Sequence, residues 1–189
     1  MKQEKIYMVT TNPGKLKEIK SYLDPIGIDL GLLEETFVEI QADTLEEVVQ
    51  YGLDRLSEEL EGDLQLIKDD SGLFIEALGG FPGVYSAYVQ RTISNPGILK
   101  LMEGADNRKA VFRTVMGYRM KGGGYALFRG ECNGAISLEM KGRQGFGYDP
   151  IFIPDGEDRS FAEMSVEEKN SVSHRIDALK KLVRYLKNK

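Results

Sequence analysis

The sequence predicts an α/β fold in one domain covering residues 1–189, with two lobes around a cleft. Short apolar segments rich in strand-forming residues alternate with segments whose apolar residues recur at helical spacing. The length of 189 residues fits one domain, and the chain contains no repeat, linker or low-complexity segment. Apolar residues make up 41% and charged residues 29%, which excludes a disordered chain, a collagen-like chain and a coiled coil.

The N-terminal part alternates strands and helices. We expect strands at 6–10, 31–40 and 64–68, and helices at 15–23 and 44–60. The first strand leads through a turn into a helix, which is the usual entry to an α/β fold. The second helix is marked by a capping box, because Thr44 and Glu47 can each bond the other's backbone N–H. The third strand ends at Asp69-Asp70-Ser71-Gly72.

The C-terminal part contains a β-hairpin followed by a terminal helix. We expect strands at 110–120, 125–129, 134–139 and 151–153, a short helix at 95–102 and a terminal helix from Ser173. Asn95 and Pro96 suit the first two positions of the short helix, and Gly122-Gly123-Gly124 suits the hairpin turn. Ser165 and Glu168 form a second capping box.

The charge balance limits the partners of the protein. Lys and Arg number 25 and Asp and Glu 30, so the net charge is −5, which argues against binding to a nucleic-acid polymer or an anionic membrane. Cys132 is the only cysteine, so an intrachain disulfide and a cysteine-based zinc site are excluded. No signal peptide is apparent, and no segment approaches the ~20 apolar residues that span a bilayer. We therefore expect a cytoplasmic protein.

The turn after the first strand has the composition of a phosphate-binding site. It consists of Thr10, Thr11, Asn12, Pro13, Gly14 and Lys15. Free N–H groups at a helix N-terminus, the helix dipole and a lysine all favour a phosphate. The turn is not a Walker A loop, because Val9 occupies the position of its first glycine. The alternative is an ordinary turn with Lys15 in solvent.

Two other segments carry candidate chemistry. Adjacent carboxylates at Asp69 and Asp70 suit a hard divalent cation, Mg²⁺ or Mn²⁺, although a solvated turn would have the same composition. The segment Phe146-Gly147-Tyr148-Asp149 places aromatic rings beside a carboxylate, which suits a stacked base, although an aromatic core contact is the alternative. Lys169 and His174-Arg175 flank a junction between helices, where a surface lysine and a structural histidine are the alternatives.

The order of these segments resembles the inosine triphosphate pyrophosphatase family, the noncanonical purine NTP pyrophosphatases, from residue 6 to residue 186. The matching motifs are T-T-N-P-G-K at 10–15, V-E-I-Q at 38–41, D-D-S-G at 69–72, L-G-G-F-P-G-V-Y-S at 78–86, F-G-Y-D-P at 146–150, A-E-M-S-V-E-E-K at 162–169 and S-H-R at 173–175. The resemblance implies a long mixed central β-sheet flanked by helices, in two lobes around the active-site cleft. It also implies a homodimer that hydrolyses ITP, dITP and XTP to the monophosphate and diphosphate with Mg²⁺.

The resemblance also assigns roles to residues. Asp70 would accept a proton from the attacking water and bind the metal with Glu39, and Lys15 would stabilise developing negative charge. His174 and Arg175 would lie close to the 6-oxo group of the purine. The substrate-binding residues would be Thr10, Thr11, Asn12, Pro13, Gly14, Lys15, Ser71, Phe146, Gly147, Tyr148, Asp149, Lys169, His174 and Arg175.

The sequence departs from the family pattern at two positions. Tyr51 stands where many relatives carry a substrate-contacting lysine, and Thr11 stands where many carry glycine. Two other functions stay open: a pyrophosphatase for modified pyrimidine nucleotides, like the related septum-formation inhibitor family, and a nucleotide sensor without turnover. The sequence assigns no role to Asp69 and does not rank ITP, dITP and XTP.

Overall fold

The computed structural model describes residues 5–34, 40–59 and 64–188. Its centre is a seven-stranded sheet in the order β2-β1-β3-β5-β6-β7, with β4 paired to β3. The strands are β1 (Ile6–Val9), β2 (Leu30–Leu33), β3 (Gln65–Ile75), β4 (Pro82–Gly83), β5 (Lys109–Arg119), β6 (Tyr125–Ile136) and β7 (Phe152–Pro154). The sheet is mixed, because β1 runs parallel to β2 and β3 whereas β4 and β7 run antiparallel to their partners.

Six helices accompany the sheet in the described part of the chain: α1 (Pro13–Leu23), α2 (Leu45–Glu59), α3 (Ser86–Thr92), α4 (Ser94–Leu101), α5 (Val166–Val172) and α6 (His174–Lys187). The predicted mixed sheet flanked by helices is therefore confirmed. Both capping boxes are present, since Glu47 N–H bonds Thr44 Oγ1 and Glu168 N–H bonds Ser165 Oγ, each at 3.2 Å. The helix α3 was not predicted. No helix in the described ranges is long and apolar enough to cross a membrane.

The chain divides into two compact units. The first comprises residues 1–70, 114–130 and 175–189, and the second comprises residues 71–113 and 131–174. Each unit has its own hydrophobic core among the described residues. The strands β3, β5 and β6 each contain residues of both units. The active-site cleft stays a prediction.

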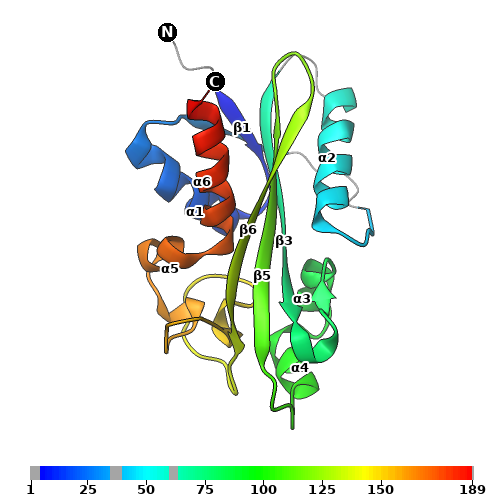
Figure 1. Ribbon diagram of the computed structural model, residues 1–189, viewed down its shortest axis with the longest axis vertical. Coiled ribbons are helices and arrows are strands. Elements are labelled where there is room, and N and C mark those ends of the chain that lie inside the picture. Colours follow the sequence, from blue (N-terminus) through cyan, green and yellow to red (C-terminus); the bar gives the residue numbers. More distant parts are fainter. Residues whose placement is uncertain (1–4, 35–39, 60–63, 189) are drawn as a thin grey trace. The chain divides into compact units, whose positions relative to one another are not determined.

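Alternation along β5 explains how the first unit covers both faces of its strands. Met116 and Tyr118 belong to the core that α1 and α6 also line. Gly117 faces the other way, and a Cβ there would lie 2.6 Å from side-chain carbons of both Val49 and Leu53 of α2. A glycine is therefore needed for α2 to pack this closely. Figure 1 shows the result, with α1 and α6 on one side of β1 and β3 and α2 on the other.

Two strand predictions are wrong at their ends. The strand predicted at 64–68 continues to Ile75, so the segment 69–72 lies inside β3 and not at its end. The residues of that segment are polar or glycine, so the apolar pattern that predicts a strand stops before them. In the structure the strand continues, and Leu73 pairs with Gly83 of β4. In the extended segment predicted at 31–40, the described strand is Leu30–Leu33 and neither Glu34 nor Ile40 is strand, whereas residues 35–39 lie outside the described residues.

The strands predicted at 125–129 and 134–139 are one continuous strand, β6, which ends at Ile136. Burial alternates through the supposed break, since Cys132 is buried while Glu131 and Asn133 are exposed. This alternation is the pattern of a strand with one polar face. The prediction of a separate third strand failed because it followed apolar residues alone.

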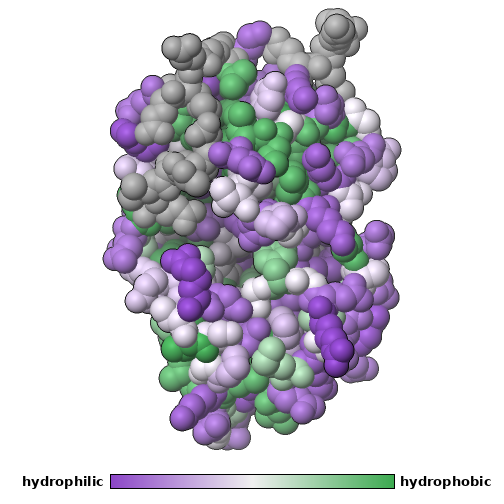
Figure 2. Space-filling view, turned by 180° about the vertical axis from the view of Figure 1, so that it is seen from behind, coloured by the Kyte–Doolittle hydropathy of each residue, from purple (hydrophilic) through white to green (hydrophobic). Residues whose placement is uncertain are grey.

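The surface of the protein carries both hydrophilic and hydrophobic side chains (Figure 2). In the view of Figure 2, hydrophilic residues cover much of the face and hydrophobic residues form patches between them. Among the large hydrophobic side chains that are exposed, five belong to the second unit between residues 81 and 101: Phe81, Tyr85, Tyr88, Ile93 and Leu101. Single exposed hydrophobic residues are ordinary on soluble domains, but several within one short segment mark a candidate contact surface.

Candidate active site

The residues predicted to form the site belong to both units. The first unit holds the turn 10–15, Asp70 and Arg175, and the second holds Ser71, the segment 146–149, Lys169 and His174. Glu39, the second predicted metal ligand, lies outside the described residues. Tyr51, which replaces the lysine of many relatives, is half-buried in α2.

The turn after β1 is closed by Asn12. Its Oδ1 accepts hydrogen bonds from the N–H groups of Gly14 at 2.9 Å and Lys15 at 3.2 Å. Its own N–H donates to Thr10 Oγ1 at 3.1 Å. The expectation of free N–H groups at this helix start is therefore wrong for these positions, and Pro13 at the first helical position has no N–H at all. A phosphate here would rely on Lys15 and the helix dipole, or would displace Asn12 from its two donors.

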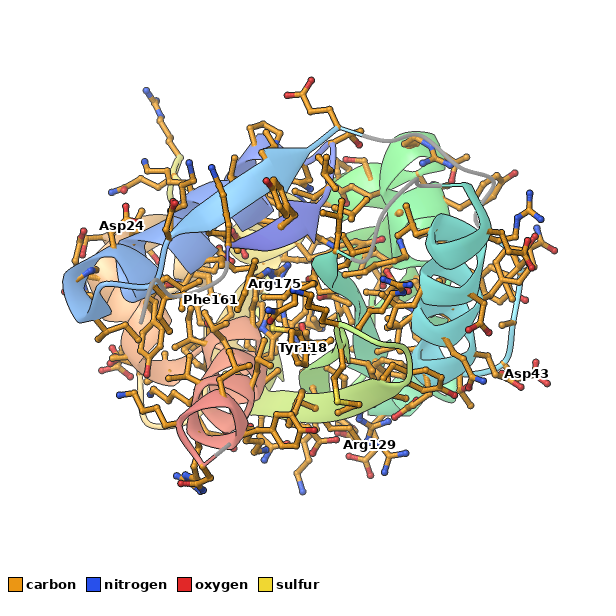
Figure 3. All side chains as sticks on the ribbon, turned by 90° about the horizontal axis from the view of Figure 1, so that it is seen from above. Asp24, Asp43, Tyr118, Arg129, Phe161 and Arg175 are labelled. Carbon is orange, nitrogen blue, oxygen red and sulfur yellow. The ribbon has the colours of Figure 1, made fainter. Side chains whose placement is uncertain are left out.

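Behind the turn lies a cluster of four charged side chains, which we call the buried charge cluster. Glu18, Asp69 and Arg175 are buried, and the side chain of Lys15 is 17% exposed. Asp69 Oδ2 lies 3.3 Å from Lys15 Nζ and 3.5 Å from Arg175 Nε. Arg175 Nε is also 3.4 Å from Glu18 Oε2. The Lys15 ammonium additionally donates to the backbone oxygen of Asp69 at 3.3 Å. Figure 3 shows Arg175 in the interior, whereas Asp24 and Asp43 of the same unit lie at the periphery.

The charges in this cluster stabilise one another. Burial alone would raise the pKa of the Asp69 carboxyl. The charges of Lys15, Arg175 and Lys68 and a hydrogen bond from Lys15 together outweigh burial, so the pKa is lowered. Asp69 is therefore ionised in the folded protein at neutral pH. The cluster has two acids and two bases, so its formal charge balances. Asp69 lies within β3, so its position is fixed by the sheet. The ion pair with Asp69 therefore holds the Lys15 side chain in place.

Neighbouring positions on β3 separate the two predicted acids. Asp69 is buried among protein cations, whereas Asp70 and Ser71 are only half-buried. Asp69 therefore has cationic partners without a metal, and Asp70 is the less buried carboxylate of this pair. A carboxylate oxygen suits Mg²⁺ or Mn²⁺. Within the described ranges, no group of three or more His, Cys, Asp and Glu residues is placed to hold a metal ion.

In the second unit, Lys169 is buried beside the F-G-Y-D segment. Its Nζ donates to Asp149 Oδ2 at 2.6 Å and lies 4.8 Å from the centre of the Phe146 ring. The side chains of Lys169 and Asp149 are 5% and 4% exposed, so the alternative of a surface lysine is wrong. A buried charge pair that also contacts an aromatic ring costs desolvation energy and is retained where it serves a specific arrangement.

The segment 146–149 folds back on itself. Asp149 Oδ2 accepts from the Phe146 N–H at 2.8 Å, so one carboxylate oxygen holds both this backbone group and Lys169. Tyr148 is buried in the core, and its hydroxyl donates to the backbone oxygen of Ser86 at 2.8 Å. Burial raises the pKa of Tyr148, so the phenol remains a neutral donor. Phe146 is half-buried, which makes it the aromatic ring of this segment that suits stacking of a base.

His174 and Arg175 are consecutive residues with different surroundings. The ring of His174 stacks on Phe112, with ring centres 4.6 Å apart and planes inclined by 7°. Arg175 belongs to the buried charge cluster in the first unit. Both side chains are buried, and their predicted place beside the purine 6-oxo group stays a prediction.

Three residues that contact these segments were missed by the sequence analysis. Glu18 pairs with Arg175, and the side-chain amides of Gln90 and Asn95 both donate to the backbone oxygen of Gly147. The partners lie more than 50 positions apart along the chain, so periodicity carries no signal for them. The burial of Glu18 next to Ile19 on α1 is the one local hint.

These observations can be compared with known proteins. A model of the Ham1 family matches residues 6–185, which is nearly the full chain. This protein belongs to the Ham1 family. It is 51% identical over 183 residues to the dITP/XTP pyrophosphatase of Thermococcus kodakarensis and 50% identical to that of Pyrococcus horikoshii, and each match covers 97% of both chains.

Solved structures agree. The Ham1 protein of Staphylococcus aureus matches 98% of this chain with a TM-score of 0.81, and a HAM1 protein from Coxiella burnetii matches 99% with a TM-score of 0.83. Both are 28% identical to this chain, and 99% and 100% of their own chains are covered.

Proposed function

We propose that this protein hydrolyses noncanonical purine nucleoside triphosphates, dITP, XTP and ITP, to the nucleoside monophosphate and diphosphate. The observation that carries the proposal is the sequence identity of this chain, 51% and 50%, to two proteins named dITP/XTP pyrophosphatase, with 97% of both chains covered. The geometry supports it independently, because a lysine held at a helix start in the first unit suits a polyphosphate. A buried Lys169–Asp149 pair beside Phe146 in the second unit suits a base.

In the proposed reaction, water attacks the α-phosphorus in line with the leaving diphosphate. A bond forms between the water oxygen and the α-phosphorus, and the bond from that phosphorus to the α–β bridging oxygen breaks. The half-buried Asp70 carboxylate accepts the proton of the attacking water. Lys15, held by Asp69, stabilises the negative charge that develops on the phosphate oxygens.

The metal of this proposal is Mg²⁺, with Mn²⁺ as a substitute. Asp70 would supply one carboxylate ligand and Glu39, outside the described residues, a second. When bound, the cation would offset charge on the triphosphate and favour ionisation of water. The homodimer implied by the family resemblance belongs to the same proposal.

Selectivity for an oxopurine rests on hydrogen-bond donors. A site that donates to a 6-oxo group leaves those donors unpaired when the base carries a 6-amino group, which can reduce kcat/KM by several orders of magnitude. Lys169, His174 and Arg175 are the side chains proposed to contact the nucleotide. We propose that they reject ATP and dATP for this reason.

The test is a Mg²⁺-dependent hydrolysis panel of dITP, XTP, ITP, GTP, ATP and dUTP, with separate detection of diphosphate and orthophosphate. We expect diphosphate release from the first three substrates and little from the others. Preference for dUTP would favour a pyrimidine pyrophosphatase instead. Binding without turnover would favour a nucleotide sensor, and orthophosphate alone would overturn attack at the α-phosphorus.

The Asp70→Asn variant tests the proton acceptor. We expect kcat to fall by at least about a hundredfold, the usual contribution of a general base, with an unchanged far-UV circular dichroism spectrum. Asp54→Asn in α2 is the matched control, because it removes the same charge from an exposed position of the same unit. A kcat of Asp70→Asn close to that of the control would refute the assignment.

A further inference from the structure

The backbone oxygen of Gly147 accepts hydrogen bonds from two side-chain amides. Gln90 Nε2 donates to it at 3.1 Å and Asn95 Nδ2 at 3.0 Å. Both donors belong to the second unit, as does the acceptor, and they come from different helices, α3 and α4. A carbonyl oxygen has two lone pairs, so this oxygen is fully used and its direction is fixed.

Helix α3 also holds Tyr148, the residue after Gly147. Ser86, one turn before Gln90 on α3, accepts from the Tyr148 hydroxyl through its backbone oxygen at 2.8 Å. Ser86 is in turn fixed to the sheet, because its Oγ accepts from the Leu73 N–H of β3 at 2.9 Å. The segment 86–95 therefore holds two consecutive residues, 147 and 148, through three hydrogen bonds. This segment is tied to the sheet rather than free to follow the loop.

The residue held in this way has a special backbone conformation. Gly147 has φ of +61°, in the left-handed region that favours glycine. It lies between Phe146 and Asp149, the ring and carboxylate proposed to receive the base. A change in the direction of the Gly147 carbonyl would rotate the peptide between them and displace both. Fixing this one oxygen therefore fixes the shape of the base-binding segment.

Two features indicate that this arrangement is not built for stability alone. Asn95 is 4% exposed, and the Asn95 Oδ1 and Gln90 Oε1 atoms are buried without a hydrogen-bond partner among the described residues. Buried acceptors in that state are costly and uncommon. Immediately before Asn95, Ser94 has φ of +58°, a left-handed conformation that few residues other than glycine adopt. Strained residues of this kind cluster at functional sites.

We propose that Gln90 and Asn95 are positioning residues that set the purine selectivity of this enzyme by fixing the Gly147 carbonyl. The inference rests on the proposed function, since it concerns the segment proposed to bind the base. The two amides do not contact the substrate. They hold Phe146 and Asp149 in the geometry that distinguishes an oxopurine from an aminopurine, and each amide alone keeps part of that geometry.

The test replaces the donors by apolar side chains of similar size, in Gln90→Met, Asn95→Leu and the double variant. The double variant removes both hydrogen bonds to the Gly147 oxygen, so we expect kcat/KM for dITP and XTP to fall at least about tenfold, mainly through KM. We also expect the ratio of kcat/KM for dITP to that for dATP to narrow. Because either amide partly replaces the other, the double variant should lose more than the product of the single losses.

A second readout does not depend on activity. Hydrogen exchange of a peptide covering 146–149 should be faster in the double variant at an unchanged melting temperature. Thr92→Val is the matched control, because it removes a donor from α3 that bonds only backbone oxygens of its own helix. Unchanged selectivity and exchange in the double variant would overturn the inference. A wild-type protein inactive on dITP and XTP would contradict the proposed function alone, and the exchange measurement would then decide whether the amides fix the segment.

Discussion

Asp69 and Asp70 are adjacent in sequence but have opposite surroundings. Asp69 lies in the buried charge cluster, where Lys15 and Arg175 offset its charge, and Asp70 is half-buried. Asp69 holds Lys15 through an ion pair from within the protein. In the proposed function, Asp70 binds the metal and accepts the proton of the attacking water. The net charge of −5 therefore does not oppose binding of a triphosphate, because the acid at this position is locally paired.

The Asp69→Asn variant tests that division of roles. The change leaves the buried Arg175 and the half-buried Lys15 with one acid fewer. Breaking the buried Asp69–Arg175 ion pair in this way costs about 3 kcal/mol of unfolding free energy. We also expect a lower kcat, because Lys15 loses its main fixed partner. Urea unfolding and steady-state kinetics measure the two effects.

The control for this variant is Asp177→Asn, which removes an exposed carboxylate paired with Lys181 at 2.8 Å. Exposed pairs contribute roughly 0.2–1 kcal/mol, so we expect little change. The effect on kcat should also disappear when Lys15 is already replaced by Met. Additive losses in the Asp69→Asn/Lys15→Met double variant would mean that Asp69 does not act through Lys15.

At the scale of elements, two capping boxes precede and begin α5. The Glu163 carboxylate accepts from the Ser160 N–H and the Glu168 carboxylate from the Ser165 N–H, each at 2.8 Å. The hydrogen bond to the Ser165 backbone, followed by the bond to Arg159, lowers the pKa of Glu168. Because a lowered pKa in the folded state favours folding only while the carboxylate is ionised, this contribution depends on pH.

The Glu168→Gln variant should therefore be less stable than the wild type in a pH-dependent way. The difference in melting temperature should be fully present above 4.5, the ordinary pKa of this group, and should disappear as the pH falls through the lowered value. Thermal melts near pH 7 and about pH 3 measure it. Glu167→Gln removes the same charge from the same turn and serves as control. A difference that persists at low pH would show that packing, not the ionised cap, is responsible.

The elements that the sequence predicted correctly are those with a local signal. The capping residues Thr44 and Ser165 and the apolar spacing of α2 and α6 lie within single segments, so one stretch of sequence contains the information. β3 was cut short at Lys68 because the next residues, 69–72, are polar or glycine and carry no apolar strand pattern, although they lie inside β3. The helix α3 was missed because a glycine-rich loop precedes it and its inward residues, Ser86 and Val89, are few.

At the scale of the whole molecule, the site is predictable only in part for the same reason. The motif residues could be named from their order along the chain, but their partners could not. The Asn95–Gly147 contact joins positions 52 residues apart, and the Lys15–Asp69 contact joins positions 54 apart. Such partners are set by sheet order and helix packing. The motifs thus indicate what the site contains, and the fold determines which residues hold it in place.

The strands β3, β5 and β6 each contain residues of both units. β3 contributes Ile67 to the core of the first unit and Leu73 to that of the second, and β5 contributes Met116 and Phe112 in the same way. When such a strand loses its packing in one core, its residues in the other core are also held less firmly. We therefore expect the two units to unfold together, so that a defect in one core is felt in the other.

Cys132 can report this coupling, because it is buried in the core of the second unit and burial raises its pKa to about 12. Labelling by a disulfide reagent at neutral pH then requires unfolding. Leu179→Ala, in the core of the first unit, should cost about 2–5 kcal/mol and accelerate labelling by the factor that corresponds to its loss of unfolding free energy in urea. The exposed neighbour variant Lys180→Ala should leave the rate unchanged. If Leu179→Ala lowers the urea midpoint but not the protection of Cys132, the second unit opens independently. The segment 146–149, which is proposed to bind the base, would then survive damage to the unit that holds Lys15 and Asp70.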